Sequence, residues 1–392
     1  MTLTLTLQDA LARGEEASSL VRRARAERTA VAARDVGASV LLPSNPVVAV
    51  GVGRRREEVG GGPRQEGVQY ALHAEQTFEI ANQRGVRRDE VAKAVDVASW
   101  RETWARAETR ARVRAVYVGA QLATAQVRAA RRREDLVQRL VDGVRTRVET
   151  GAASTVDLEL ARLERGRATR DRITAELATA TALSDLRVLI ALAPDTRLDL
   201  TSPLGAPAAP PPLAALLGRA RERRAEFRIL QASRSEIDAA VVRLRRETVP
   251  NPTLFLDVQR DLPGQTYLGG GIALPLPVWR RNQGELAVAR AERGRLAEEE
   301  DVTAREVSAE VERAYRAALA FGEMVQTLER EVLPAAEAGV DLVDQGWRAG
   351  KFDLFRVIQA SREASDARRS QLESLGALWE AMIAVDRATG TP

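Results

Sequence analysis

Apolar and polar residues alternate with a period of two in two stretches of this chain. In residues 45–80, one side of a strand collects apolar side chains and the other collects polar ones: Val68, Tyr70 and Leu72 against Gln69, His73 and Glu75. Residues 251–279 repeat the pattern, with Leu254, Leu256 and Val258 against Thr253, Asp257 and Gln259. Such alternation is typical of a strand with two different faces. Each stretch is therefore predicted to form a β-hairpin.

The two stretches are opened and closed by the same residues. Asn-Pro begins each of them, at Asn45-Pro46 and Asn251-Pro252, and a short Asn-Gln segment follows each of them, within residues 81–85 and 281–284. The charged, Gly-rich residues 54–67 predict a long solvated loop in the first hairpin, and residues 261–264 predict a short turn in the second.

The remainder of the chain predicts long helices. We expect them over about residues 6–34, 83–150, 155–192, 213–247 and 284–349, and from the break at Gly350 to about residue 388. A continuous helix over 83–150 would be about 90–100 Å long, far beyond an ordinary globular helix. Gly151 and Gly350 interrupt the pattern where each long helix has to reverse direction, and glycine has the backbone freedom for such a turn.

The spacings indicate a duplication. Asn45 and Asn251 lie 206 residues apart, while Gly151 and Gly350 lie 199 apart, as do Gly85 and Gly284. Tyr117 and Tyr315 depart from that offset by one residue. We therefore divide the chain into a first repeat (1–192), a Pro-rich connector (193–212) and a second repeat (213–392).

Composition excludes several classes of function. Of the 392 residues, 4% are aromatic and 29% are charged, which fits long helices packed through small side chains. Because the chain has no cysteine, one histidine and three methionines, we expect no disulfide, no thiolate nucleophile, no soft-metal cage and no cofactor. A net charge of +4 from 59 basic and 55 acidic residues indicates a mixed surface rather than a nucleic-acid footprint.

The membrane signals lie in the strands. There is no run of eighteen apolar residues, and Met1–Leu5 lacks the basic start of a signal peptide. The two hairpins are too apolar on one side to be stable alone in water, and four strands cannot close a barrel. We therefore expect several chains to pool their strands into a barrel with an apolar exterior and a polar lumen. The alternative, a β-sandwich packed on its own core, leaves the helices unexplained.

The last helix shows coiled-coil spacing. Two sets of positions recur every seven residues: Ile358, Ser365, Leu372, Trp379 and Asp386, and Leu354, Ser361, Arg368, Leu375 and Met382. Because both rows contain polar residues, we interpret this helix as part of a wall with one wet side rather than of a dry core.

These features resemble the TolC family of outer-membrane factors. The resemblance lies in the duplicated Asn-Pro hairpins, in Gly271–Leu276 before a long helix, and in the glycine breaks followed by Asp157-Leu158 and Ala161-Arg162. Residues 75–80 followed by Arg84 and Arg88 resemble the cobalt-zinc-cadmium branch. The resemblance implies a mainly α fold with a small β part: a coiled-coil α-barrel, and four strands per chain in a homotrimeric twelve-stranded transmembrane β-barrel. It also implies an outer-membrane location with a long periplasmic extension that docks a periplasmic adaptor and an inner-membrane pump.

Candidate membrane residues follow from the alternation. We expect five side chains to face lipid: Val50, Tyr70, Leu72, Leu254 and Leu256. Four polar side chains should face the lumen or the wet rims: Gln69, Glu75, Asp257 and Gln259. Trp279, at the end of the fourth strand, should join an aromatic girdle at the membrane interface.

Candidate entrance residues follow from the resemblance, which makes the turns at Gly151 and Gly350 the periplasmic tip. By register from Gly350, the family's ring positions fall on Arg356 and Gln359, with Asp353 one turn earlier. Asp157 matches the aspartate of the first repeat, but Phe352 replaces the usual basic partner. We expect Asp353 or Asp157 to lie within salt-bridge reach of an arginine; capping of a helix is the alternative role for both.

No group of residues predicts catalysis. We interpret His73 as a lumen-facing or interface histidine rather than a metal ligand, because no second histidine or cysteine accompanies it. Gly269–Gly271 lack the continuation of a phosphate-binding loop and predict curvature or close backbone approach. The favoured function is a passive exit duct of a tripartite efflux system that binds no nucleic acid. The alternatives are the outer channel of a type I protein-secretion system and a soluble coiled-coil scaffold.

Overall fold

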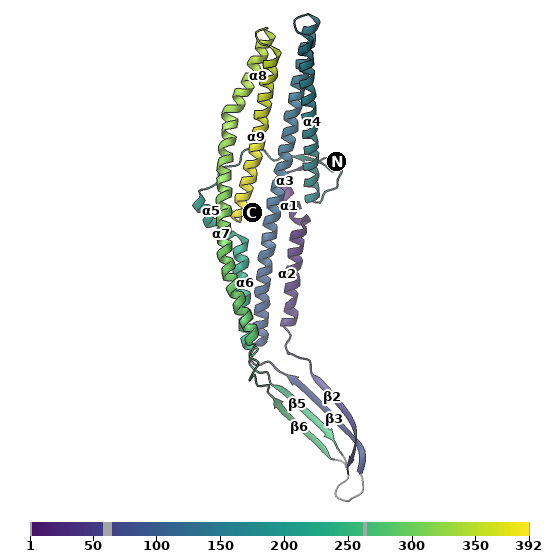
Figure 1. Ribbon diagram of the computed structural model, residues 1–392. Coiled ribbons are helices and arrows are strands. Elements are labelled where there is room, and N and C mark those ends of the chain that lie inside the picture. Colours follow the sequence, from purple (N-terminus) through teal and green to yellow (C-terminus); the bar gives the residue numbers. More distant parts are fainter. Residues whose placement is uncertain (1, 58–64, 262–264, 392) are drawn as a thin grey trace. The chain divides into compact units, whose positions relative to one another are not determined.

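The computed structural model describes residues 2–57, 65–261 and 265–391, which are mostly helical with a small sheet (Figure 1). The chain forms two compact units. Unit 1 comprises Met1–Ala24, Glu102–Phe227 and Thr303–Pro392, and unit 2 comprises Arg25–Arg101 and Arg228–Val302. Each unit therefore draws segments from both predicted repeats.

Unit 2 contains the sheet. Its four antiparallel strands are β2 (Val47–Glu57), β3 (Gln65–Thr77), β5 (Thr253–Arg260) and β6 (Thr266–Ala273), in the order β2-β3-β5-β6. The two predicted hairpins are thus joined through β3 and β5. Parts of four helices complete the unit: α2 (Ser19–Ala38), α3 (Gln83–Glu149), α6 (Ala225–Arg246) and α7 (Gln283–Thr327).

Both hairpins were predicted, but their limits differ from the prediction. Residues 54–57 continue β2 instead of starting a loop. Strand β6 ends at Ala273 rather than at Val278, because Pro275 and Pro277 have no N–H to donate to a neighbouring strand. Residues 58–64 of the predicted loop and 262–264 of the predicted turn lie outside the described residues.

The repeated Asn-Gln segments form the same strand-to-helix turn twice. Asn82 and Asn282 have positive φ values of 58° and 55°, a conformation that asparagine tolerates better than most residues. The side-chain oxygen of Gln83 accepts a hydrogen bond from the Ala81 N–H at 2.8 Å, and Gln283 does the same for Arg281 at 2.7 Å. Glutamine at the helix start thus satisfies a turn N–H that lies before the helix.

Unit 1 is built mainly from long helices. Besides parts of α2, α3, α6 and α7, it contains α1 (Leu7–Ala17), α4 (Thr155–Leu189), α5 (Leu213–Arg223), the π-helical turn η1 (Leu328–Val332), α8 (Leu333–Arg348) and α9 (Leu354–Ala388). Two similar hydrophobic clusters lie in it, one from each repeat, around Tyr117 and around Val311. Within the described residues, no helix has both the length and the apolar composition needed to cross a membrane.

A short parallel pair of strands was not predicted. Strand β1 (Thr2–Leu5) pairs with β4 (Arg197–Leu200), which lies inside the Pro-rich connector. The buried Tyr117 fastens this pair, because its hydroxyl donates to the Leu5 carbonyl at 2.8 Å and accepts from the Ser202 N–H at 3.3 Å. Four-residue strands are too short for alternation to distinguish them from loops.

Three predicted helices are divided. The helices expected over 6–34 and 213–247 break at Ser18 and Arg224, which occupy equivalent positions in the two repeats. The hydroxyl groups of Ser18 and Thr109 lie 3.0 Å apart, whereas Arg224 pairs with Glu310 at 2.7 Å. The helix expected over 284–349 contains η1, just before Pro334.

The π-helical turn explains a mismatch between the repeats. One more residue separates Tyr315 from Gly350 than separates Tyr117 from Gly151. A π-turn holds one residue more than an α-turn, so η1 absorbs this difference. The Gln371 side chain of α9 donates a hydrogen bond to Glu329 in this turn, at 2.9 Å.

The helix reversals use one turn geometry. Gly151 and Gly350 have φ values of +75° and +73°, and the residues after them close Schellman motifs onto Arg147 and Gly346. Ala191 adopts the same motif after α4 with φ 52°, although it carries a side chain.

These turns predict opposite effects of two substitutions. Ala191→Gly should stabilise the protein and Gly151→Ala should destabilise it, each by about 1 kcal/mol, because the left-handed conformation costs an L-residue about 1–2 kcal/mol. No atom lies within 4 Å of a β-carbon built on Gly151, so its cost is conformational. Thermal midpoints at fixed protein concentration measure both effects. Equal midpoints for Gly151→Ala and the parent protein would contradict this account.

Candidate functional site

The sheet has one apolar face that is exposed. Directly opposed residues on neighbouring strands share a face, and the register aligns Val50 with Leu72, and Leu72 with Val258. All five predicted lipid-facing residues lie on this apolar face, with exposed fractions from 42% to 73%: Val50, Tyr70, Leu72, Leu254 and Leu256. The register therefore places them together; their contact with lipid stays a prediction.

The opposite, polar face carries a histidine between two carboxylates. His73 is aligned with Asp257, and their Nδ1 and Oδ1 atoms lie 2.8 Å apart. The Nε2 atom lies 3.4 Å from Oε2 of Glu75, and the ring stacks against Phe255 with centroids 6.2 Å apart. The other predicted lumen residues, Gln69 and Gln259, share this polar face. Sequence reasoning saw an isolated histidine, because only the strand register brings Asp257 beside it.

Two of the three neighbouring glycines mark close approach on the polar face. A β-carbon at Gly269 would meet the Tyr267 ring, and one at Gly271 would meet the Phe255 ring. Trp279 does not end a strand as predicted, since β6 stops at Ala273; its side chain is 85% exposed in the bend that follows.

The two aspartates predicted at the entrance cap helices. Asp157 forms a capping box with Ser154 at the start of α4, and the two backbone-to-side-chain bonds are 3.0 and 3.1 Å. Asp353 is the N-cap of α9 and accepts from the Arg356 N–H at 3.0 Å. Within the described part of the chain, neither carboxylate pairs with an arginine. The salt bridge that we expected is therefore absent there, because these oxygens satisfy free N–H groups at helix starts.

The predicted ring positions have other partners. The guanidinium of Arg356 lies over the Phe352 ring, 5.2 Å from its centroid. Gln359 donates to Glu363 at 3.1 Å along the same helix. Phe352 thus holds a basic side chain against its own ring.

Arg147 connects the two helix reversals, which sequence reasoning missed. This side chain, near the end of α3, donates to the carbonyls of Trp347 and Arg348 at 2.9 and 3.1 Å. Its guanidinium also lies 4.4 Å from the centre of the Trp347 ring. A cation of the first repeat therefore binds the last carbonyls of α8, where the helix dipole favours positive charge.

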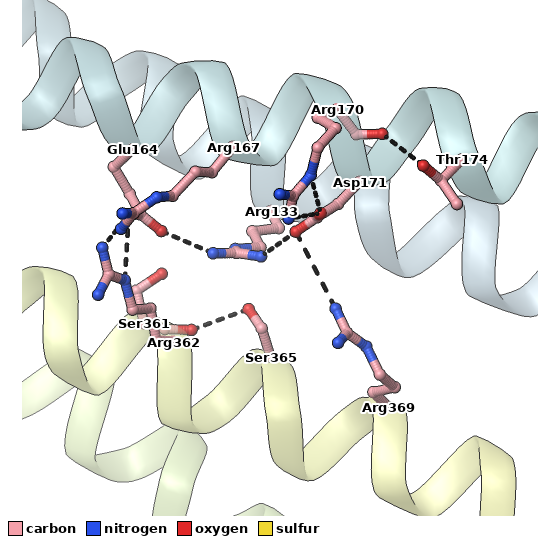
Figure 2. Close-up of polar contacts among 10 residues, drawn as sticks. All are labelled: Arg133, Glu164, Arg167, Arg170, Asp171, Thr174, Ser361, Arg362, Ser365 and Arg369. Atoms are coloured by element: carbon pink, nitrogen blue, oxygen red, sulfur yellow. Dashed lines mark hydrogen bonds and ion pairs between the residues drawn. The ribbon is translucent and has the colours of Figure 1, made fainter.

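A buried glutamate joins three helices deeper in unit 1. Glu164 of α4 is 2% exposed and accepts hydrogen bonds from Arg133 of α3 at 2.6 Å and from Nε of Arg362 of α9 at 3.0 Å (Figure 2). Arg167 lies 3.5 Å away. Burial raises the pKa of Glu164, but the hydrogen bonds and charges of Arg362 and Arg133 outweigh it, so the pKa is lowered overall.

A second carboxylate extends this cluster along a groove. Arg133 also bonds Asp171 at 2.7 Å, and Arg170 and Arg369 lie 2.7 and 4.0 Å from the same carboxylate (Figure 2). The groove has a volume of about 820 Å³ between α3, α4, α8 and α9, and polar members of the predicted heptad rows line it: Ser361, Ser365 and Arg368. Polar positions of both heptad rows thus line this groove, as a wall with one wet side would require.

The Glu164 cluster is an electrostatic tie between the two repeats. Glu164 lies between Ala161 and Ala168 on the buried side of α4, so the signal for it was a charged residue within a stripe of alanines. Among the described residues, no group of three or more His, Cys, Asp or Glu side chains is placed to hold a metal ion together.

Removing the charge of Glu164 should be costly. Glu164→Gln would remove the carboxylate from the half-exposed Arg362 and leave the mostly buried Arg133 with Asp171 alone, and we expect a loss of about 1–3 kcal/mol. Glu159→Gln is the matched control, because Glu159 is exposed and pairs only along its own helix with Arg162; it should cost less than about 0.5 kcal/mol. Chemical denaturation of both variants measures the difference, and equal effects would contradict the proposed tie.

This difference should depend on pH. The folded-state pKa of Glu164 is lower than its unfolded value, so its stabilisation is present above the unfolded pKa and is lost as pH falls through the folded pKa. The stability gap between the parent and Glu164→Gln should therefore be constant near neutrality and shrink below about pH 4. Thermal midpoints of both proteins between pH 3 and pH 7 test this prediction. A stability difference that stays constant over this range would show that the charge of Glu164 does not cause the difference.

Comparisons with known proteins agree with this architecture. Residues 216–391 match the family model described as "Outer membrane efflux protein". The cobalt-zinc-cadmium resistance protein CzcC of Cupriavidus metallidurans is 29% identical over 323 residues, covering 80% of this chain and 75% of its own.

Solved structures share the fold at low sequence identity. CusC, described in terms of folding and transmembrane channel formation, matches with a TM-score of 0.75 at 15% identity, over 98% of this chain and 92% of its own. A membrane protein from Pseudomonas aeruginosa matches with a TM-score of 0.77 at 16% identity, over 98% of this chain and 90% of its own. Residues 216–391 thus match the outer membrane efflux protein family, a relative of 29% identity spans most of the chain, and the solved structures share its fold.

Proposed function

We propose that this chain is the outer-membrane channel of a tripartite efflux system. Three copies pool their sheets into a twelve-stranded β-barrel, and their long helices form an α-barrel in the periplasm. A periplasmic adaptor and an inner-membrane pump deliver the substrate, which passes through the duct without chemical change. The match of residues 216–391 to the outer membrane efflux protein family and the similarity to CzcC support the role in efflux.

The observation that carries this proposal is the exposed apolar face of a sheet with two open edges. Among the described strands, β2 pairs only with β3 and β6 pairs only with β5. Unpaired edge groups and an exposed apolar face are unfavourable in water, and four strands are too few to close a barrel. Copies of the same sheet joined edge to edge satisfy the edges, and a bilayer accepts the apolar face.

We infer that the substrates are divalent transition-metal cations. The relative that spans most of this chain is named for resistance to cobalt, zinc and cadmium. Selection among cations would rest mainly with the pump, since the duct is passive.

We place the entrance at the two helix reversals. In a trimer, Gly151 and Gly350 would contribute six turns around one axis, and Arg356 and Gln359 would each be repeated three times. An Arg356 ring would oppose the passage of cations unless carboxylates such as Asp157 and Asp353 offset its charge. The exposed Trp279 would lie at the membrane interface.

A reconstitution experiment tests the channel. We expect the protein to require detergent, to elute as a trimer and to form pores in planar bilayers. Arg356→Ala should raise the preference for cations in single-channel recordings, and Asp353→Ala should lower it, because each removes one sign of charge near the entrance. A protein that stays soluble and monomeric without detergent would contradict the proposal and favour a coiled-coil scaffold. Unchanged selectivity in both variants would place the constriction elsewhere.

Paired arginine substitutions test which face meets lipid. Leu72→Arg puts a charge on the apolar face and should reduce the yield of assembled trimer, since arginine at a bilayer midplane costs about 2–4 kcal/mol. Gln69→Arg puts the same charge on the polar face of the same strand and should assemble normally. The reverse result would mean that the polar face contacts the lipid.

A further inference from the structure

We propose that the Nε2 atom of His73 and the carboxylate of Glu75 bind a divalent transition-metal ion on the polar face of the sheet, while Asp257 holds the imidazole in place. This inference deepens the proposed function, since it names the contact that an exported cation would make in the β-barrel. It stands on three properties of the site: the hydrogen bond that orients the imidazole, the distance between the two ligands, and their accessibility.

Asp257 determines which nitrogen of His73 is free. A carboxylate can only accept, so Nδ1, 2.8 Å from Asp257 Oδ1, must carry the hydrogen. In the neutral imidazole, Nε2 then presents its lone pair to the Glu75 carboxylate. These two acceptors face one another, so a cation placed between them, a proton or a metal ion, is held by both. A carboxylate on the far nitrogen is also the usual support for a metal-bound histidine.

The distance between the two ligands suits a metal ion better than a proton. Nε2 and Oε2 of Glu75 lie 3.4 Å apart, whereas a charge-assisted N–H···O bond is normally about 2.7–2.9 Å long. Zinc bonds of about 2.0–2.1 Å to nitrogen and about 2.0–2.2 Å to oxygen, at a tetrahedral angle, place two ligand atoms about 3.4 Å apart. The pair is therefore already spaced as two corners of such a site.

The site is open to solvent and oriented by its neighbours. The side chains of His73 and Glu75 are 35% and 41% exposed. Ala49 is aligned with His73 on the other neighbouring strand, so only a small side chain lies on that side. Phe255 stacks against the imidazole and restricts its rotation. Water can complete the coordination without a change in the sheet.

The ligand set selects the class of ion. Imidazole with a carboxylate suits Zn²⁺, Co²⁺ and Cu²⁺, whereas Mg²⁺ and Ca²⁺ prefer sites made of oxygen alone. Two protein ligands bind more weakly than the three or four of a catalytic or structural zinc site. Weak binding is suited to a conduit, because an ion that passes through must also leave.

The binding test uses the full-length protein in detergent, with ZnCl₂ and CuCl₂ as probes. In calorimetric titration, the parent should bind Zn²⁺ saturably, and His73→Asn and Glu75→Gln should each weaken binding at least tenfold. Asp257→Asn should weaken it about 10–100-fold, as expected for loss of a carboxylate that supports a ligand. Gln259→Ala, on the same strand and face as Asp257, is the matched control and should bind like the parent.

Electron paramagnetic resonance distinguishes the histidine that binds the metal ion from the aspartate that orients it. With Cu²⁺ bound, the nitrogen coupling should persist in Asp257→Asn and Glu75→Gln and disappear in His73→Asn. Glu75→Gln leaves the bond between His73 and Asp257 intact, so it tests the metal site without loosening β3 from β5. The inference would be overturned if the parent did not bind Zn²⁺. It would also be overturned if His73→Asn and Glu75→Gln bound Zn²⁺ as strongly as the parent does.

The outcome is independent of channel activity. A protein that forms pores but binds no Zn²⁺ at His73 would contradict this inference and leave the proposed function standing. A protein that binds Zn²⁺ through His73 but forms no pores would contradict the proposed function alone.

Discussion

Backbone hydrogen bonding at the edges of the sheet constrains this molecule more than any single side chain does. The ladders β2-β3, β3-β5 and β5-β6 satisfy the inner strands, and the outer sides of β2 and β6 remain open among the described residues. An edge of this kind pairs with another strand or is protected by charge, proline or a bulge. Long exposed strands with apolar residues on one side have little such protection, which is why we propose that the sheet is one part of a larger assembly.

The two predicted repeats contain turns of the same backbone geometry, formed by the same residue types. An asparagine with positive φ and a glutamine cap lead from strand to helix at Asn82 and at Asn282. A glycine in the left-handed region reverses the helices at Gly151 and Gly350. The repeats also meet through unlike contacts: Arg147 binds carbonyls at the end of α8, and Glu164 of α4 accepts from Arg362 of α9.

Much of this architecture was predictable, because it rests on local signals. The helix expected over 83–150 runs over Gln83–Glu149, and the helix after the first reversal begins at Thr155 as predicted. Alternation alone gave the membership of both sheet faces. The remainder depends on contacts between distant segments. Glu164 looks like a solvated charge in the sequence, and its burial follows only when α3 and α9 pack beside α4. Alternation already placed Glu75 on the same face as His73, whereas Asp257 lies beside His73 only through the strand register.

The π-helical turn at Leu328–Val332 has a consequence for how the two repeats present themselves. One residue advances an α-helix by about 100°, so an inserted residue rotates every later side chain by that angle unless it is accommodated within one turn. By taking up the insertion locally, the turn keeps α8 in phase with its reversal at Gly350. The two helical hairpins thus reach their tips in the same backbone register and differ partway along their length. A partner that binds the tips meets one turn geometry twice in each chain with different side chains on it, whereas a partner that binds the walls meets two different helix geometries.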